Sequence, residues 1–376
     1  MSAVLPLSPE SGPRPTRVGA HTRWMGLLGQ LLVPVGAVLA AFALFSLLLL
    51  WLGRSPIEFA ELVWKGGFGT PFSIRNTLQR MPPLILCALA VAVPAQLGLM
   101  VIGGEGTLVL AGLACAAIAV PFAGGSAPAE LVVPLMVCVA MLVGALWFGV
   151  AAQARNKRQV NEVISSLLLS YVGIALMNFF VEGMLRDPDQ PSKSSTVPVA
   201  ANYLVGPMPG VGVHWGLAVA LLAAVGLHLL VSRTTFGFAM RIAGGNPRAA
   251  RAQGLPVERL VLVGMAIGGA CAGLAGYFEV AAVQGRANAS LAAGYGFTGI
   301  LVSFMARHHP LGIVPVALLF AGLAAADGLV QRRLGLPDGV MLLLQSVIFL
   351  ALLVSQSLHG SRIGTRLLAR LRGVRA

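Results

Sequence analysis

Long apolar runs separated by short polar breaks dominate this chain. A transmembrane helix needs about 20 consecutive apolar residues, and this spacing predicts an all-α polytopic membrane protein with about ten transmembrane helices. One run, 298–306, is too short to cross alone, so we expect it to be extended by its flanks or to belong to a broken helix. The other predicted spans are, in chain order, 24–52, 81–100, 107–122, 130–152, 161–181, 214–231, 260–283, 311–330 and 340–357.

A polar, basic segment, 232–258, separates the sixth predicted span from the seventh. Within it, Asn246 is a typical helix N-cap, Pro247 suits the first helical position, and Gly254 suits a left-handed stop. These signals predict a helix of about two turns outside the bilayer. A solvated loop is one interpretation, and a docking element for a cytosolic protein is the other, which we favour because the spans themselves do not require such a helix.

The composition excludes a soluble globular domain. Hydrophobic residues make up 57% of the chain, charged residues only 10%, and the mean hydropathy is +0.85, whereas soluble domains are about a quarter charged. The net charge of +13 lies in short clusters between apolar runs, which indicates membrane topology and not nucleic-acid binding. With ten crossings and the N-terminus inside, both termini are cytoplasmic and the inside segments hold most of the Arg, whereas the Arg332–Arg333 pair falls outside. The predicted inside segments are 1–23, the break at Glu105, 155–158, 232–258, 307–309 and the C-terminal tail.

These boundaries predict a cytoplasmic N-terminal tail over 1–23, a transmembrane domain over 24–359 and a basic cytoplasmic tail over 360–376. The Pro/Gly-interrupted second and third spans correspond to the Gly-interrupted seventh and eighth spans. They would run in opposite directions, as in an inverted repeat. The polar stretch 54–80 is expected to form a loop that lies partly on the membrane surface.

No catalytic or metal-binding pattern is present. The chain lacks P-loop, HExxH and GxSxG motifs, its His residues are scattered, and its four Cys lie singly inside predicted spans. We therefore expect no enzyme activity and no metal or cofactor bound by this chain. Transport would draw its energy from an ion gradient or from a partner.

Polar residues in or near the spans are candidates for a translocation path. Glu105 and Glu279, among small residues, suit either a hydrogen bond between helices or the path. For Glu162, an interfacial or capping role is the stronger alternative. For Asn178 and Gln345, a hydrogen bond between helices is the stronger alternative. The candidates are Glu105, Asn161, Glu162, Asn178, Glu279 and Gln345.

Several segments, in this order, resemble permeases of bacterial ABC importers of the ribose, simple-sugar and nucleoside branch. The basic segment TFGFAMRIAGGNPRAARAQGLPVER is similar to their coupling segment. The others are GLMVIGGEG over 98–106, NEVISS over 161–166, LRDP over 185–188, AGLAGYFEVAAVQGR over 272–286, GYGFTGI over 294–300 and HPLGI over 309–313. Thr298, where many relatives carry Asp, and SFMAR over 303–307 depart from the family's pattern.

The resemblance implies a permease in the bacterial inner membrane, paired with a second permease, related but different in sequence. A cytosolic ATPase would bind ATP and Mg²⁺, and a basic-membrane-lipoprotein-type binding protein would deliver a nucleoside or simple sugar. The alternative is a secondary transporter driven by an ion gradient. The residues that the resemblance assigns to ATPase coupling are Arg241, Gly245, Asn246, Pro247, Arg248, Ala250, Arg251 and Gly254.

Overall fold

The computed structural model describes residues 36, 38–122, 124–125, 127–190, 193–210, 212–337 and 339–360. The predicted tail over 1–23, the start of the first span and nearly all of the predicted C-terminal tail lie outside the described residues. Contacts divide the chain into a main unit, Leu49–Ser346, and a second unit from the two chain ends. Among the described residues there are helices and isolated bridges but no strand, which confirms the all-α prediction.

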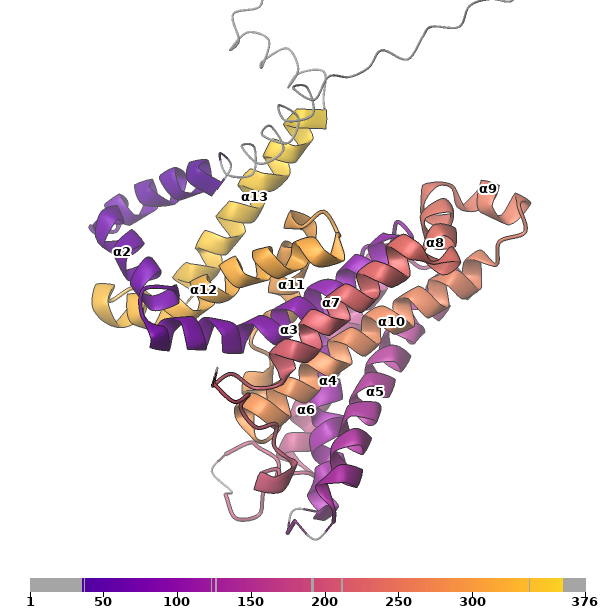
Figure 1. Ribbon diagram of the computed structural model, residues 1–376, viewed down its shortest axis with the longest axis horizontal. Coiled ribbons are helices and arrows are strands. Elements are labelled where there is room, and N and C mark those ends of the chain that lie inside the picture. The colour runs from indigo at the N-terminus through magenta and orange to yellow at the C-terminus, as the bar shows by residue number, and fades with distance from the viewer. Residues whose placement is uncertain are drawn as a thin grey trace, which may run out of the picture. The chain divides into compact units, whose positions relative to one another are not determined.

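Figure 1 shows the helices. They are α2 Pro56–Gly67, α3 Pro71–Ala95, α4 Gly104–Ala119, α5 Ala129–Arg158, α6 Glu162–Glu182, α7 Gly216–Arg233, α8 Thr235–Gly245, α9 Pro247–Ala252, α10 Val257–Phe278, α11 Tyr295–Met305, α12 Pro310–Leu334 and α13 Val340–Gly360. A π-helical turn, Glu279–Gln284, continues α10.

Seven described helices are long and apolar enough to cross a membrane, and an eighth span results if Val38–Trp51 and Pro56–Gly67 count as one. A multi-pass membrane protein is thereby confirmed. Helix α11 has only 11 residues, about 16 Å at 1.5 Å per residue, too short to cross the roughly 30 Å core. The prediction that its run belongs to a broken helix fits this length.

The prediction of a loop over 54–80 was wrong, because local capping builds helix there. Ser55 accepts a hydrogen bond from the Glu58 N–H at 3.4 Å at the start of α2. Thr70 accepts one from the Ser73 N–H at 3.0 Å at the start of α3. Each cap is followed by a proline, which suits the first helical turn. Helix α3 therefore begins at Pro71 and not at residue 81.

Helix α3 lies at the centre of the main unit, in contact with α7, α10, α11 and α12, while α10 packs against α4 and α5. Small residues allow the α5 and α10 backbones to touch. A methyl group added at Gly144 would lie 2.1 Å from the carbonyl oxygen of Gly269, and one at Gly273 would lie 2.1 Å from that of Ala140. The small-residue run in the seventh predicted span thus packs closely, as expected in lipid.

Candidate functional site

The basic segment contains the helix that its sequence predicts. The Asn246 side chain accepts hydrogen bonds from the backbone N–H groups of Arg248 and Ala249, both at 3.1 Å. Pro247 is the first residue of α9, and Gly254 has a φ of +81°, which favours glycine. These signals give a capped helix of six residues between α8 and α10.

Helix α8, which the sequence analysis did not separate from the polar segment, joins α9 to the spans. The Thr234 hydroxyl caps it by accepting from the Gly237 N–H at 3.2 Å. The Arg241 guanidinium donates to the Val231 carbonyl near the end of α7. A methyl group at Gly244 would lie 2.4 Å from the Gln96 carbonyl oxygen. Helix α8 is therefore held against α7 and the C-terminal end of α3.

The predicted coupling residues divide between an inner and an outer face of α9. Ala250 is fully buried and attaches α9 to the main unit, whereas Arg248 is exposed. Arg251 forms an ion pair with Glu258 at 2.8 Å, with both side chains about half exposed. Gly245 has open space around its Cα hydrogens. Helix α9 thus presents basic side chains to its surroundings.

Several segments predicted to be cytoplasmic gather around α9. A cavity of about 60 Å³ is lined by residues of the α3–α4 break, the end of α5, α9 and the start of α10. The Asn156 amide donates to the Glu258 carbonyl at 2.9 Å. The Gln96 amide donates to the His308 carbonyl at 3.2 Å. Burial lowers the pKa of the His308 imidazole. These contacts place the segments at one end of the main unit.

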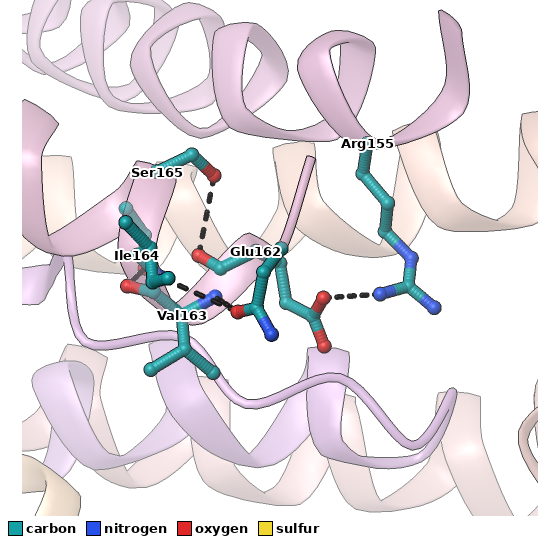
Figure 2. A network of polar contacts seen from close by, with 7 residues as sticks. Arg155, Glu162, Val163, Ile164 and Ser165 are labelled. Atoms are coloured by element: carbon teal, nitrogen blue, oxygen red, sulfur yellow. Dashed lines mark hydrogen bonds and ion pairs between the residues drawn. The ribbon is translucent and has the colours of Figure 1, made fainter. Parts of the chain in front are cut away.

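Two candidate path residues take part in the turn between α5 and α6 (Figure 2). Glu162 forms an ion pair with Arg155. The Asn161 side chain caps α6 by accepting from the Val163 N–H at 2.8 Å and the Ile164 N–H at 3.4 Å. These contacts give both residues structural roles at the bundle end near α9, and their part in a path stays a prediction.

The remaining amide candidates lie on separate helices. Asn178 is half-buried on α6, and Gln345 on α13 is buried. Nothing in their positions assigns them to a path.

Glu105 is 1% exposed and lies in the first turn of α4, so the prediction that it belongs to a flexible break between spans was wrong, and its side of the membrane stays a prediction. Its carboxylate accepts hydrogen bonds from the Gly294 N–H at 2.7 Å and the Gly296 N–H at 2.5 Å. It therefore caps α11 while lying in the first turn of α4, and a carboxylate at a helix N-terminus is stabilising. The starts of two helices far apart in sequence meet at this residue, although the inverted repeat itself stays a prediction.

Serines of α6 make this depth possible. The non-helical stretch before α4 enters the bundle, where unsatisfied backbone groups are costly. The Ser166 hydroxyl accepts from the Ile102 N–H at 3.1 Å, and the Ser170 hydroxyl accepts from the Gly106 N–H at 2.7 Å. Since these serines are four residues apart, they lie on one face of α6. They replace the helical hydrogen bonds that the break removes.

Glu279 and two residues that the sequence analysis missed lie near Glu105. Glu279 is only 2% exposed and begins the π-helical turn, a feature often found at functional sites. It lies within electrostatic range of Arg80 and Glu105, and Arg80 interacts electrostatically with Tyr295 at the start of α11. Arg80 was assigned to the expected loop, although its position directly before an apolar run was a possible signal.

Two buried side-chain polar atoms in the described part of the chain lack a hydrogen-bond partner: Arg80 Nε and Asp327 Oδ1. Ionisable groups inside membrane helices are costly and mark functional positions by default. The buried carboxylates Glu105 and Glu279 and the half-buried Arg80 and Tyr295, hereafter the central polar cluster, therefore form the candidate solute site. It lies where α4 begins, α10 distorts and α11 begins, as expected for broken helices that line a path.

Comparison with known proteins gives a consistent result. A family profile described as "Branched-chain amino acid transport system / permease component" matches residues 73–355. A glucose ABC transporter permease protein of Haloferax volcanii is 34% identical over 346 residues, which cover 88% of this chain and 89% of the relative. A guanosine ABC transporter permease protein of Bacillus subtilis is 31% identical over 331 residues, 86% of this chain and 93% of the relative. A nucleoside ABC transporter permease protein of Lactococcus lactis is 29% identical over 330 residues, with 85% and 90% covered.

Proposed function

This chain belongs to the family of permease components of branched-chain amino acid transport systems, and from that premise we propose that it forms the path by which an ATP-driven importer passes a nucleoside or a simple sugar. It is a membrane-spanning permease subunit of an ABC importer. The observation that carries the proposal is the match over residues 73–355, which includes every helix from α4 to α12 and most of α3. The relatives' names supply the two substrate classes.

We assign ATP and Mg²⁺ binding to a separate cytosolic ATPase that receives α9. The exposed Arg248 and the half-exposed Arg251 suit a cleft with acidic side chains. When the ATPase closes, a push on α9 reaches α8 through Asn246, which is both the C-cap of α8 and the N-cap of α9. From α8 it passes to α7 through Arg241 and to α3 through Gly244. The helices then alternate between inward-open and outward-open arrangements.

The rest of the assembly follows from the same assignment. The chain would cross the bacterial inner membrane ten times with both termini in the cytoplasm. A second permease, related but different in sequence, would complete the path, and an extracytoplasmic lipoprotein would deliver the solute. This arrangement places α9 inside and the α2 end of the bundle outside.

Charge reversal on α9 tests the proposal in the complete transporter. We expect Arg248→Glu combined with Arg251→Glu to lower uptake and solute-stimulated ATP hydrolysis by about tenfold or more, because a loss of ~1.4 kcal/mol in docking is already tenfold. Membrane insertion should be unchanged, since both side chains are exposed or half exposed. Lys193→Glu, a reversal at an exposed residue far along the chain from α9, is the control. Normal uptake and ATP hydrolysis in the α9 variant would refute the docking role.

A further inference from the structure

A cavity of about 750 Å³ lies between α2, the first turns of α3 and the last turns of α12. That volume is within the range of small-molecule sites, about 300–1,000 Å³. Its lining combines apolar and polar residues, and the polar ones include Glu58, Lys65, Ser73, Asn76, Arg80 and Arg333. The cavity is therefore large enough for a nucleoside or a sugar and rich in hydrogen-bonding groups.

A polar stripe of α3 runs from this cavity to the central polar cluster. Ser73, Asn76 and Arg80 all line the cavity and recur at helical spacing, so they lie on one face. Arg80 lies seven positions after Ser73, a rise of about 10 Å. Two turns further along, Cys87 lies within electrostatic range of Glu105 and Glu279. The polar stripe thus leads from the cavity toward the buried carboxylates.

Arg80 occupies the junction between the cavity and the cluster. Its Nε is buried and has no hydrogen-bond partner, although buried donors are nearly always paired. Its guanidinium interacts electrostatically with Tyr295 and with Glu279. These neighbours hold a guanidinium that still has a donor to offer.

The cavity lies at the end of α3 remote from α9. Helix α3 has 25 residues, about 37 Å at 1.5 Å per residue, enough to cross the hydrocarbon core. The residue after its C-terminal end, Gln96, contacts α8 at Gly244, whereas the cavity begins at Thr70, the N-cap. If α9 faces the ATPase, the cavity opens on the other side of the membrane.

We propose that this cavity is the solute's extracytoplasmic entrance and that Arg80 is the residue that recognises the solute at its inner end. The inference rests on the proposed importer function. A guanidinium presents parallel N–H donors that pair with two adjacent acceptors. The recognised solute is therefore one with two adjacent acceptors, such as the O6 and N7 atoms of a 6-oxopurine nucleoside or neighbouring hydroxyl oxygens of a sugar.

Cysteine labelling tests the entrance without knowledge of the solute. Asn76→Cys would be made in the full chain, expressed in cells with its partners, with the exposed Cys138 replaced by serine. We expect a membrane-impermeant thiosulfonate added outside to label this cysteine. Ala249→Cys on α9, where the side chain is exposed, should react only after the membrane is permeabilised.

Uptake measurements test recognition, with guanosine, adenosine and glucose as probes. We expect Arg80→Gln to lower uptake of guanosine or glucose, whichever the wild type carries, by about tenfold, and Arg80→Lys to retain more, because one lost bidentate pair is worth about 1–3 kcal/mol. If the solute is a 6-oxopurine nucleoside, Arg80→Gln should also raise adenosine uptake relative to guanosine, since Gln pairs with adenine N6 and N7. Glucose would show only the loss. Arg75→Gln, at an exposed position of the same helix, is the control.

The outcomes separate this inference from the function on which it rests. If Asn76→Cys is not labelled from outside, or if uptake by Arg80→Gln is unchanged, the inference is wrong. The proposed importer function still stands in that case, provided that Ala249→Cys is labelled only from the cytoplasm. Labelling of Ala249→Cys from outside overturns the topology and with it the proposed function. A wild type that carries neither guanosine nor glucose overturns the solute class. Assembly with the ATPase, checked by co-purification, shows that the Arg80 variants are folded.

Discussion

Removal of the Asn246 side chain is the sharpest test of how α9 works. The lost interactions are two hydrogen bonds at 3.1 Å to the N–H groups of Arg248 and Ala249. Replacing an Asn cap by Ala costs about 1 kcal/mol, and that energy is about a fivefold change in an equilibrium constant. Helix α9 has six residues, far fewer than the roughly 12 that make an isolated helix even marginal. Its order therefore depends on this cap and on the burial of Ala250.

We expect Asn246→Ala to reduce the initial rate of solute uptake by about fivefold, measured with the complete transporter in proteoliposomes, with a parallel loss of solute-stimulated ATP hydrolysis. Asn246→Asp retains the acceptor and should stay close to the wild type. The control is Asn288→Ala, which removes a cap of the same type far along the chain from α9. The Asn288 side chain accepts a hydrogen bond from the Ser290 N–H at 2.9 Å, and its loss should not reduce uptake. The reasoning fails if Asn246→Ala transports normally or if Asn246→Asp is equally impaired.

Two further predictions concern stability, measured by thermal unfolding of the detergent-solubilised protein. Gly106→Ala should cost about 1–3 kcal/mol of stability through overpacking, because the new methyl group would lie 2.2 Å from the Ser170 carbonyl oxygen. The control Gly226→Ala meets open space and should not destabilise the protein. Equal unfolding temperatures of the two variants would contradict this prediction. Burial lowers the pKa of His308, so the unfolded chain binds a proton more readily. Stability should be full above about pH 6.5 and fall as the pH drops through that value, and His308→Asn should weaken this dependence.

Local chemistry made some elements predictable from sequence. The cap, proline and left-handed glycine around Asn246 specify α9 without help from the rest of the fold, because each acts through hydrogen bonds within four residues. The same type of signal existed at Ser55 and Thr70, followed by prolines. The mixed charges of 54–80 favour a loop in the same stretch and obscure these caps. Capping was the better guide to helix boundaries than charge.

Depth within the bundle could not be predicted from sequence. Glu105 lies among glycines between apolar runs, which suggests a surface break as readily as a buried one. Its burial depends on Ser166 and Ser170, more than 60 residues away, which satisfy the backbone of the break. Its charge is satisfied by the start of α11, about 190 residues away. Such partners become visible only when the packing of α4, α6 and α11 is known.

Helix α3 is the element that allows the two candidate regions to act on one another. Its C-terminal end touches α8, and Arg80 lies in its first half. Pro82 and Pro83 follow Arg80 inside the helix, and proline removes a backbone donor and favours bending. We therefore expect a push at α8 to bend α3 at Pro94, near the contact, and at Pro82 and Pro83, just beyond Arg80. Such a bend would change the position of the Arg80 guanidinium relative to Glu279 and Tyr295 without requiring the cavity-lining turns of α3 to move. In this way α9, at one end of the bundle, could alter solute binding at the other end.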